Sequence, residues 1–598
     1  MPMIAETFEA ALGHHRAGRI AQAADLYRKI LERAPDHADS LHLLGMLVQQ
    51  AGRHAVAAGL IGKAVALRPG FAEAHNSLGI ALQFLGRRPE AAAAFERAAA
   101  LKPDHAEAHY NLGNLRRAEG DLAGAGAAFR RSIALRPGAP EAHNNLGNAL
   151  QQEGRLVEAR ACYERALALR PDHLSALNNL GNVNRLEGRF EEARALFERA
   201  LARKPDYADA HNNLGILLRL EGRFAEALVH SDRALAVTPN APGPLNNRGN
   251  LLQDLGRLDE AEASLGRALA VEPDFAGAHH NLGMVLLAAG RFEAGWREYE
   301  WRWRTPQAAD LARRFTQPQW QGEALAGGTL LVHAEQGLGD TLQFCRYVPL
   351  LVQADRQIVF EVPRPLLRLM GSLDGVATGQ VRVVAQGEAL PPFDRHCPLM
   401  SLPRLCGTRL DTIPSGAPYL TADPETRQIW QAHLAAGDAR ALKVGLVWSG
   451  NPRAHLPELT AIDRRRSIPA DLLRPLAACA GVRFYSLQKD GPPPPAGLDL
   501  IDVMAEMQDF ADTAALVAQL DLVISVDTSV AHLAAALGKP VWLLNRFDSC
   551  WRWLTDRDDS PWYPSLRLFR QTAPGDWPGV VERVVPALQA LAASEAGR

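Results

Sequence analysis

One short segment in the second half of the chain combines residue types that bind anions. Asp527-Thr528-Ser529 follows an apolar run, and His532 comes one helical turn later. Short polar side chains of this kind stand at helix starts, where free backbone N–H groups and the helix dipole attract a phosphate. The segment therefore predicts an anion site suited to a diphosphate. The alternative is ordinary helix capping beside a packed histidine.

A serine hydrolase is not expected from the same residues. Asp527, Ser529 and His532 stand too close together in sequence for the usual triad geometry, and the chain has no GxSxG motif.

Three consecutive arginines are a second candidate for anion binding. Arg464, Arg465 and Arg466 precede Ser467-Ile468-Pro469, and guanidinium groups pair well with phosphate oxygens. The alternative is a solvated loop. Two ring-rich segments, 551–553 and 560–564, either stack on a base or sugar or pack two domains together.

The elements that must position these residues alternate between strands and helices. Apolar runs predict strands at 329–334, 357–362, 443–448, 482–487, 522–526 and 541–544, with helices at 341–351 and 530–537. This alternation is typical of parallel α/β layers, in which ligands bind beyond the carboxyl ends of strands. We expect two Rossmann-like halves that face a cleft, at 329–430 and 431–598, after a linker at 306–328.

The first half of the chain repeats every 34 residues, a period typical of the tetratricopeptide repeat. A glycine-arginine pair begins at Gly18, Gly52, Gly86, Gly154, Gly188, Gly222, Gly256 and Gly290. The repeats predict an α-solenoid over residues 1–305, with eight regular units and a degenerate ninth. The ninth ends in aromatic residues up to Trp303, and we expect it to dock onto the next domain.

An asparagine also recurs two residues before a glycine on the first helix of six repeats. The set is Asn111, Asn145, Asn179, Asn213, Asn247 and Asn281. Asparagine is a poor helix-interior residue, and a row of amides along a groove suits an extended peptide backbone. The alternative is that duplication copied a neutral residue. Histidines also recur once per repeat and are not expected to bind a metal, because they do not cluster.

Bulk properties exclude several classes. The 598 residues have a formal net charge of -2, which gives no reason to expect nucleic acid or an anionic membrane as a partner. Six scattered cysteines without a CxxC pair argue against a zinc site and a disulfide framework. The amphipathic N-terminus is unlike a signal peptide, and no apolar stretch is long enough for a membrane span. These features predict a cytoplasmic protein.

The segment 520–544, LDLVISVDTSVAHLAAALGKPVWLL, resembles the donor site of the lipopolysaccharide heptosyltransferase-like glycosyltransferases, which have the two-domain GT-B fold. The resemblance implies that Asp340 in Gly337-Leu338-Gly339-Asp340 is the base for the acceptor, the alternative being a helix cap. It also implies donor binding by Gly337, Gly339, Arg464–Arg466 and Asp527–Ser529 with His532. Ser529 stands where the family has glycine, and Ile468 where tryptophan is common.

The asparagine row resembles the ladder in the tetratricopeptide superhelix of the O-linked N-acetylglucosamine transferases. In plan the chain is also similar to flagellin-modifying glycosyltransferases. These resemblances imply a glycosyltransferase that moves a sugar from a nucleotide-activated donor, without cofactor or metal, to a protein held by the repeats. A flagellin-like acceptor is a specific possibility. The alternatives are a glycan acceptor such as lipopolysaccharide, and a non-catalytic scaffold.

Overall fold

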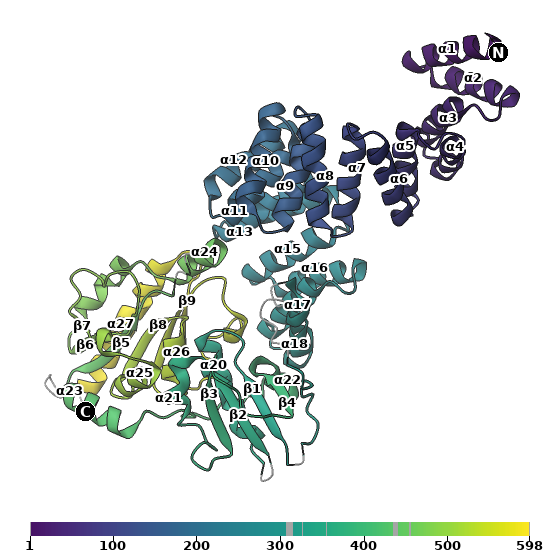
Figure 1. Ribbon diagram of the computed structural model, residues 1–598. Helices are drawn as coiled ribbons and strands as arrows, with labels where there is room; N and C mark the ends of the chain where they lie inside the picture. The colour runs from purple at the N-terminus through teal and green to yellow at the C-terminus, as the bar shows by residue number, and fades with distance from the viewer. Residues whose placement is uncertain are drawn as a thin grey trace. The chain divides into compact units, whose positions relative to one another are not determined.

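The computed structural model describes residues 2–306, 315–325, 327–353, 356–434, 440–451, 453 and 456–596. The chain forms two compact units, Met1–Pro205 and Asp206–Arg598 (Figure 1). Residues 307–314 and 326 of the predicted linker lie outside the described residues. No helix among the described residues is long and apolar enough to cross a membrane.

The first unit consists of paired helices. Their bounds are α1 (Pro2–Arg16), α2 (Ile20–Arg33), α3 (Ala38–Gln50), α4 (His54–Leu67), α5 (Ala72–Phe84), α6 (Arg88–Leu101), α7 (Ala106–Ala118), α8 (Leu122–Leu135), α9 (Pro140–Gln152), α10 (Leu156–Leu169), α11 (Leu174–Leu186) and α12 (Phe190–Arg203).

Two glycines of each repeat explain how a helix pair closes. Gly154 ends the turn after α9 with a φ of +78°, a conformation that other residues rarely adopt. Gly147 lies inside α9 against the ring of Tyr163 on α10, where an added Cβ would come within 2.6 Å of the ring. Tyr163 is consequently buried between the two helices.

The recurring histidines have a structural role. The ring Nε2 of His75, His109, His143 and His279 donates to the carbonyl oxygen of the proline six residues earlier, at 2.8–3.3 Å. Each of these histidines thus ties a repeat's first helix to the turn before it.

The second unit begins with the remaining repeats. Their elements are α13 (Ala208–Leu220), α14 (Phe224–Val237), α15 (Pro242–Asp254), α16 (Leu258–Val271), α17 (Ala276–Ala288), the short α18 (Phe292–Tyr299) and the 3-10 helix η1 (Glu300–Arg304). As expected, the aromatic end docks onto the following domain: Trp296 packs edge-on against Trp551, Trp562 and Phe344. This contact also decides the role of the ring-rich segments, since Trp551 and Trp562 are buried packing residues.

Two parallel sheets follow. The first has the order β3-β2-β1-β4, and the second the order β10-β9-β8-β5-β6-β7. Their strands are β1 (Thr329–His333), β2 (Gln357–Val362), β3 (Val381–Ala385), β4 (Arg395–Pro398), β5 (Leu442–Val447), β6 (Val482–Ser486), β7 (Leu500–Asp502), β8 (Leu522–Val526), β9 (Val541–Asn545) and β10 (Leu566–Arg570). The predicted fold class, a repeat solenoid followed by α/β Rossmann-like layers, is confirmed.

Helices connect and cover these strands. They are α20 (Leu338–Phe344), α21 (Leu367–Met370), α22 (Leu402–Leu405), α23 (Pro424–Leu434), α24 (Pro457–Arg466), α25 (Phe510–Val517), α26 (Ser529–Ala536) and α27 (Trp577–Ala596). The helix predicted at 341–351 is wrong in extent. It starts at Leu338 and ends at Phe344, and 3-10 turns with Pro349 continue the chain. Helix α23 crosses the predicted boundary at residue 430 and packs on α25.

Candidate functional site

A cavity of about 490 Å³ lies where the two sheets meet, and loops from both sheets line it. Residues 337–340 come from the turn between β1 and α20, and residues 527–529 with His532 come from the turn between β8 and α26. Helices α20 and α26 lie side by side in Figure 1 and are in contact. Both turns follow the carboxyl end of a strand, the place where parallel sheets bind ligands.

Asp340 lines this cavity, and both of its carboxylate oxygens accept hydrogen bonds. Oδ2 accepts the backbone N–H of Gly337 at 3.0 Å, and Oδ1 accepts from the guanidinium of Arg552. The predicted cap is therefore present, and it is combined with a buried ion pair. A carboxylate has about four lone-pair positions, so Asp340 can still accept a proton from a bound group.

Arg552 stays charged beside Asp340. Burial opposes the charge, but the carboxylate of Asp340 and nearby groups outweigh it, so the pKa of Arg552 lies above its ordinary value. Its Nε also donates to Gln343 at 2.8 Å. Because Arg552 is held at both ends of its guanidinium, it fixes the orientation of the Asp340 carboxylate.

His532 is buried and neutral at the same meeting point. Burial lowers the pKa of His532 to about 4, with Arg552 also lowering it and Asp527 opposing. Its Nδ1 lies 2.9 Å from the hydroxyl of Tyr563, and its Nε2 lies 3.8 Å from Asp527 Oδ1. Gly339 lets the first half approach the imidazole, since an added Cβ would lie 3.0 Å from the ring.

The cavity also has positively charged side chains and a helix N-terminus, which suit an anion. Four arginines (453, 466, 546 and 552) and two aspartates (340 and 527) line the cavity. The N-terminus of α26 opens into it, and Thr528, the N-cap residue, makes no side-chain cap bond with the described helix. The side chain of Thr528 therefore does not cap α26, and the first residues of the helix lie at the cavity wall.

The three predicted arginines lie in three different environments. Arg466 lines the cavity and pairs with Asp463. Arg464 is exposed and outside the cavity lining. Arg465 turns to the repeats and Asp548. The three adjacent side chains diverge because they occupy the last turn of helix α24, where successive residues point about 100° apart.

Several lining residues were missed from the sequence. Arg453 and Arg546 stand singly in loops and Arg552 in a single 3-10 turn, where no spacing marks them. Arg552 had one usable signal, its place between two tryptophans in a segment singled out for its rings.

The last repeat contacts the residues that precede the turn with Asp340. Arg302, buried in the last repeat, donates to Glu335 at 2.9 Å and to Ser401. Gln336 donates to the hydroxyl of Tyr299 at 2.8 Å. Residues 335 and 336 directly precede Gly337, so the end of the solenoid holds the turn that carries Asp340.

The asparagine row forms hydrogen bonds between neighbouring repeats. The amide nitrogens of Asn111, Asn247 and Asn281 each donate to an asparagine oxygen 35 residues earlier, at 2.8–3.0 Å. Asn179 donates to Asn144 and Asn148, and Asn145 to Tyr110 and Asn114. Asn213 accepts from Asn212 at 3.4 Å. Half-buried throughout, the row uses its N–H groups mainly on the protein itself.

Family comparisons agree with this arrangement. Residues 8–72, 76–140, 138–206, 187–243 and 246–300 match sequence models of the tetratricopeptide repeat. Residues 495–544, which contain β8, β9 and the turn with His532, match glycosyltransferase family 9 (heptosyltransferase).

Individual relatives match over part of the chain. Protein FlbA of Caulobacter vibrioides (strain ATCC 19089 / CIP 103742 / CB 15) is 31% identical over 336 residues, which cover 51% of this chain and 53% of FlbA. The chain thus spans about half the length of this curated relative. The crystal structure of MamA is 28% identical and covers 27% of this chain and 94% of its own, with a TM-score of 0.26.

A chain of the APC/C hetero-tetramer Cut9–Hcn1 is 22% identical and covers 46% of this chain and 55% of its own, with a TM-score of 0.37. The chain has tetratricopeptide repeats followed by an α/β part in which one segment matches glycosyltransferase family 9, a combination that supports a glycosyltransferase.

Proposed function

We propose that the chain transfers a sugar from a nucleoside-diphosphate donor to a protein held by the repeats. One observation carries the proposal: a single cavity joins a carboxylate from the first sheet to arginines and a helix N-terminus from the second. A transferase of this kind needs a base near the acceptor and positive charge near the leaving diphosphate.

In the proposed reaction an acceptor hydroxyl oxygen attacks the anomeric carbon of the donor sugar. The new C–O bond forms as the bond from that carbon to the diphosphate oxygen breaks, and the electron pair leaves with the nucleoside diphosphate. Asp340 takes the hydroxyl proton, and Arg552 keeps the carboxylate pointed at the cavity. His532, neutral because of its burial, lines the wall between acceptor and donor.

The leaving group is stabilised by fixed charges in this proposal. Arg466, Arg546 and the amides of α26 face the cavity and replace the counter-charge that a metal supplies elsewhere. We therefore expect transfer to persist in a chelator. The cysteines are all free, which fits a reducing compartment such as the cytoplasm.

The asparagine row has a narrower role in acceptor binding than six free amides would have. Both N–H groups of Asn145 and Asn179 already have partners in the protein. An extended peptide would therefore be bound mainly through its own N–H groups, which donate to side-chain oxygens of the row. A flagellin-like protein remains our specific candidate for the acceptor.

A panel of nucleotide sugars tests the function. We expect release of nucleoside diphosphate from at least one donor, and a loss of turnover of about 10²–10⁴-fold in Asp340→Asn, which keeps the shape of the side chain. Nucleotide affinity should change little, because the base does not hold the diphosphate. Absence of turnover with every donor, together with tight protein binding, would identify a scaffold instead.

A further inference from the structure

Among the arginines that line the cavity, Arg546 has a buried N–H group without a partner in the described part of the chain, which points to a ligand. It lines the cavity, and its buried Nε has no hydrogen-bond partner among the described residues. Its Nη1 donates to the carbonyl oxygen of Ile462 at 3.3 Å and lies 3.5 Å from Asp548 Oδ2. A buried N–H donor without a partner is costly, and a phosphate oxygen in the cavity would complete it.

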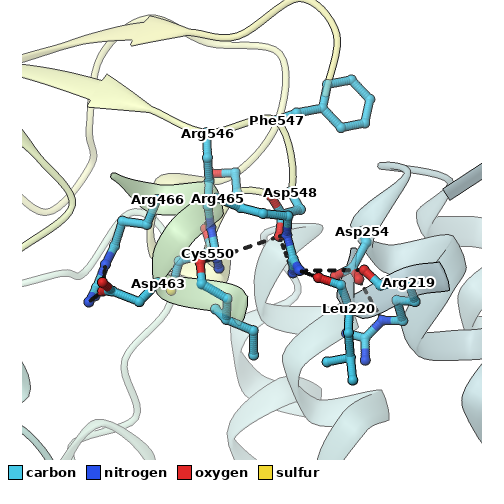
Figure 2. Close-up of polar contacts among 12 residues, drawn as sticks. Arg219, Leu220, Asp254, Asp463, Arg465, Arg466, Arg546, Phe547, Asp548 and Cys550 are labelled. Atoms are coloured by element: carbon cyan, nitrogen blue, oxygen red, sulfur yellow. Dashed lines mark hydrogen bonds and ion pairs between the residues drawn. The ribbon is translucent and has the colours of Figure 1, made fainter. Parts of the chain in front are cut away.

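Asp548 is buried and holds two arginines at one oxygen (Figure 2). Besides Arg546, its Oδ2 accepts from Nε and Nη2 of Arg465 at 3.1 and 2.9 Å. A buried carboxylate in contact with two guanidinium groups fixes the place of both, because separating either leaves a charge without its partner.

Arg465 carries this network into the repeats. Its Nη1 donates to the carbonyl oxygen of Leu220 at 2.6 Å, and a second carbonyl, that of Arg219, lies 3.4 Å away. Leu220 is the last residue of α13, so the guanidinium satisfies carbonyl groups at the negative end of a helix. The guanidinium also lies 5.6 Å from the ring centre of Phe224, the first residue of α14.

Neighbouring contacts make the connection rigid. The rings of Phe224 and Phe547 stack with centres 6.3 Å apart, and Phe547 lies between Arg546 and Asp548 in sequence. Arg219 bonds Asp254 of α15 at 2.5 Å, so the end of α13 is fixed to the following repeat. Repeat seven, which we define as α13 and α14, is thus connected to the cavity through three residues: Arg465, Asp548 and Arg546.

We propose that Arg465 and Asp548 are positioning residues that hold Arg546 against repeat seven, so that Arg546 presents its Nε to a donor diphosphate. The proposal rests on the proposed function and adds that the repeats are part of the donor site. The ladder residue Asn213 lies on the same helix, α13, so one repeat faces both substrates.

The test is calorimetric titration of the full chain with nucleoside diphosphates, and with the nucleoside of the tightest binder. Asp548→Asn and Arg465→Gln should each weaken diphosphate binding about tenfold, the scale of a charge-assisted hydrogen bond, and leave nucleoside binding within twofold. In turnover both variants should raise the KM for the donor more than they lower kcat. Arg465→Lys should not restore affinity, because an ammonium cannot reach Asp548 and the α13 carbonyls as a planar fork.

Arg474 and Asp471 provide the matched control. They form an exposed ion pair at 2.8 Å in the same half of the enzyme, and Arg474→Gln should bind the diphosphate as the wild type does. Wild-type affinity in Asp548→Asn and Arg465→Gln would overturn the inference and leave the proposed function intact. An equal loss of nucleoside and diphosphate affinity would also overturn it, since that indicates general damage. Failure of the wild-type chain to bind any nucleoside diphosphate would overturn both.

Discussion

The asparagine row of the repeats and the cavity differ in how their polar groups are paired. Along the row, an asparagine amide donates to side-chain oxygens of the preceding repeat, as Asn179 does with Asn144 and Asn148. In the cavity, the buried Nε of Arg546 has no hydrogen-bond partner among the described residues, although a buried donor without a partner is costly, and no side chain caps the N-terminus of α26. An anion bound in the cavity would offset that cost.

The largest expected effect concerns Asp340, the cavity carboxylate that is paired with Arg552 and can still accept a proton. Arg552→Met removes the partner of Asp340 and keeps the length of the side chain. We expect turnover to fall at least about 100-fold, because the carboxylate loses its orientation. Steady-state kinetics measure this, with Arg474→Met as the control; turnover within threefold of the wild type would show that the pair is only structural.

The buried imidazole predicts a pH dependence of stability. The pKa of His532 is lowered to about 4 by burial, so the folded protein binds fewer protons than the unfolded chain between pH 4 and the ordinary histidine value. Its contribution is complete above the unfolded pKa and is lost as the pH falls toward 4, by up to about 3 kcal/mol.

Urea unfolding of the wild type and of His532→Gln at several pH values tests this dependence. His280, whose pKa is also lowered to about 4, contributes to both proteins, so the difference between the curves isolates His532. Parallel curves would contradict the prediction.

A substitution at one glycine should destabilise the packing of a helix pair in the repeats. Gly147→Ala places a Cβ within 2.6 Å of Tyr163 and should lower the unfolding free energy by about 1–3 kcal/mol. Gly138→Ala is the matched control, since nothing lies within 4 Å of the added Cβ. Thermal melting compares the two, and equal melting temperatures would show that the helix pair tolerates a wider spacing.

The smallest expected effect distinguishes a structural role of the asparagine row from a role in acceptor binding. Asn179→Ala removes two hydrogen bonds and should cost about 1–2 kcal/mol of stability, whereas Gln152→Ala, at an exposed helix end, should cost little. If the row also binds the acceptor, the KM for a protein acceptor should rise several-fold. An unchanged KM beside a lowered stability would make the row structural only.

The sequence predicted the helices and strands that have a periodic or locally recognisable pattern. The repeat interval located the helix pairs, and apolar runs located the central strands β1, β2, β5, β6, β8 and β9. The four edge strands of the two sheets, β3, β4, β7 and β10, were missed. Short strands such as β7 (Leu500–Asp502) have no clear sequence pattern.

The site was predicted only where residues stand next to each other in the chain. Asp340 and His532 each belong to a recognisable turn, and the structure brings both to the cavity. The partnership of Asp340 with Arg552 spans 212 positions and leaves no local trace. The side chains of Arg464, Arg465 and Arg466 point in different directions because α24 ends at Arg466, and the run of arginines alone does not predict where the helix ends.

The most direct test of the proposed donor site is a structure of the full chain with a bound nucleoside diphosphate. We expect phosphate oxygens within about 3 Å of Arg546 Nε and of the first amides of α26, a hydrogen-bond distance, with Asp340 free of the nucleotide. A nucleotide bound elsewhere, with the Nε of Arg546 still without a partner, would contradict the proposed donor site.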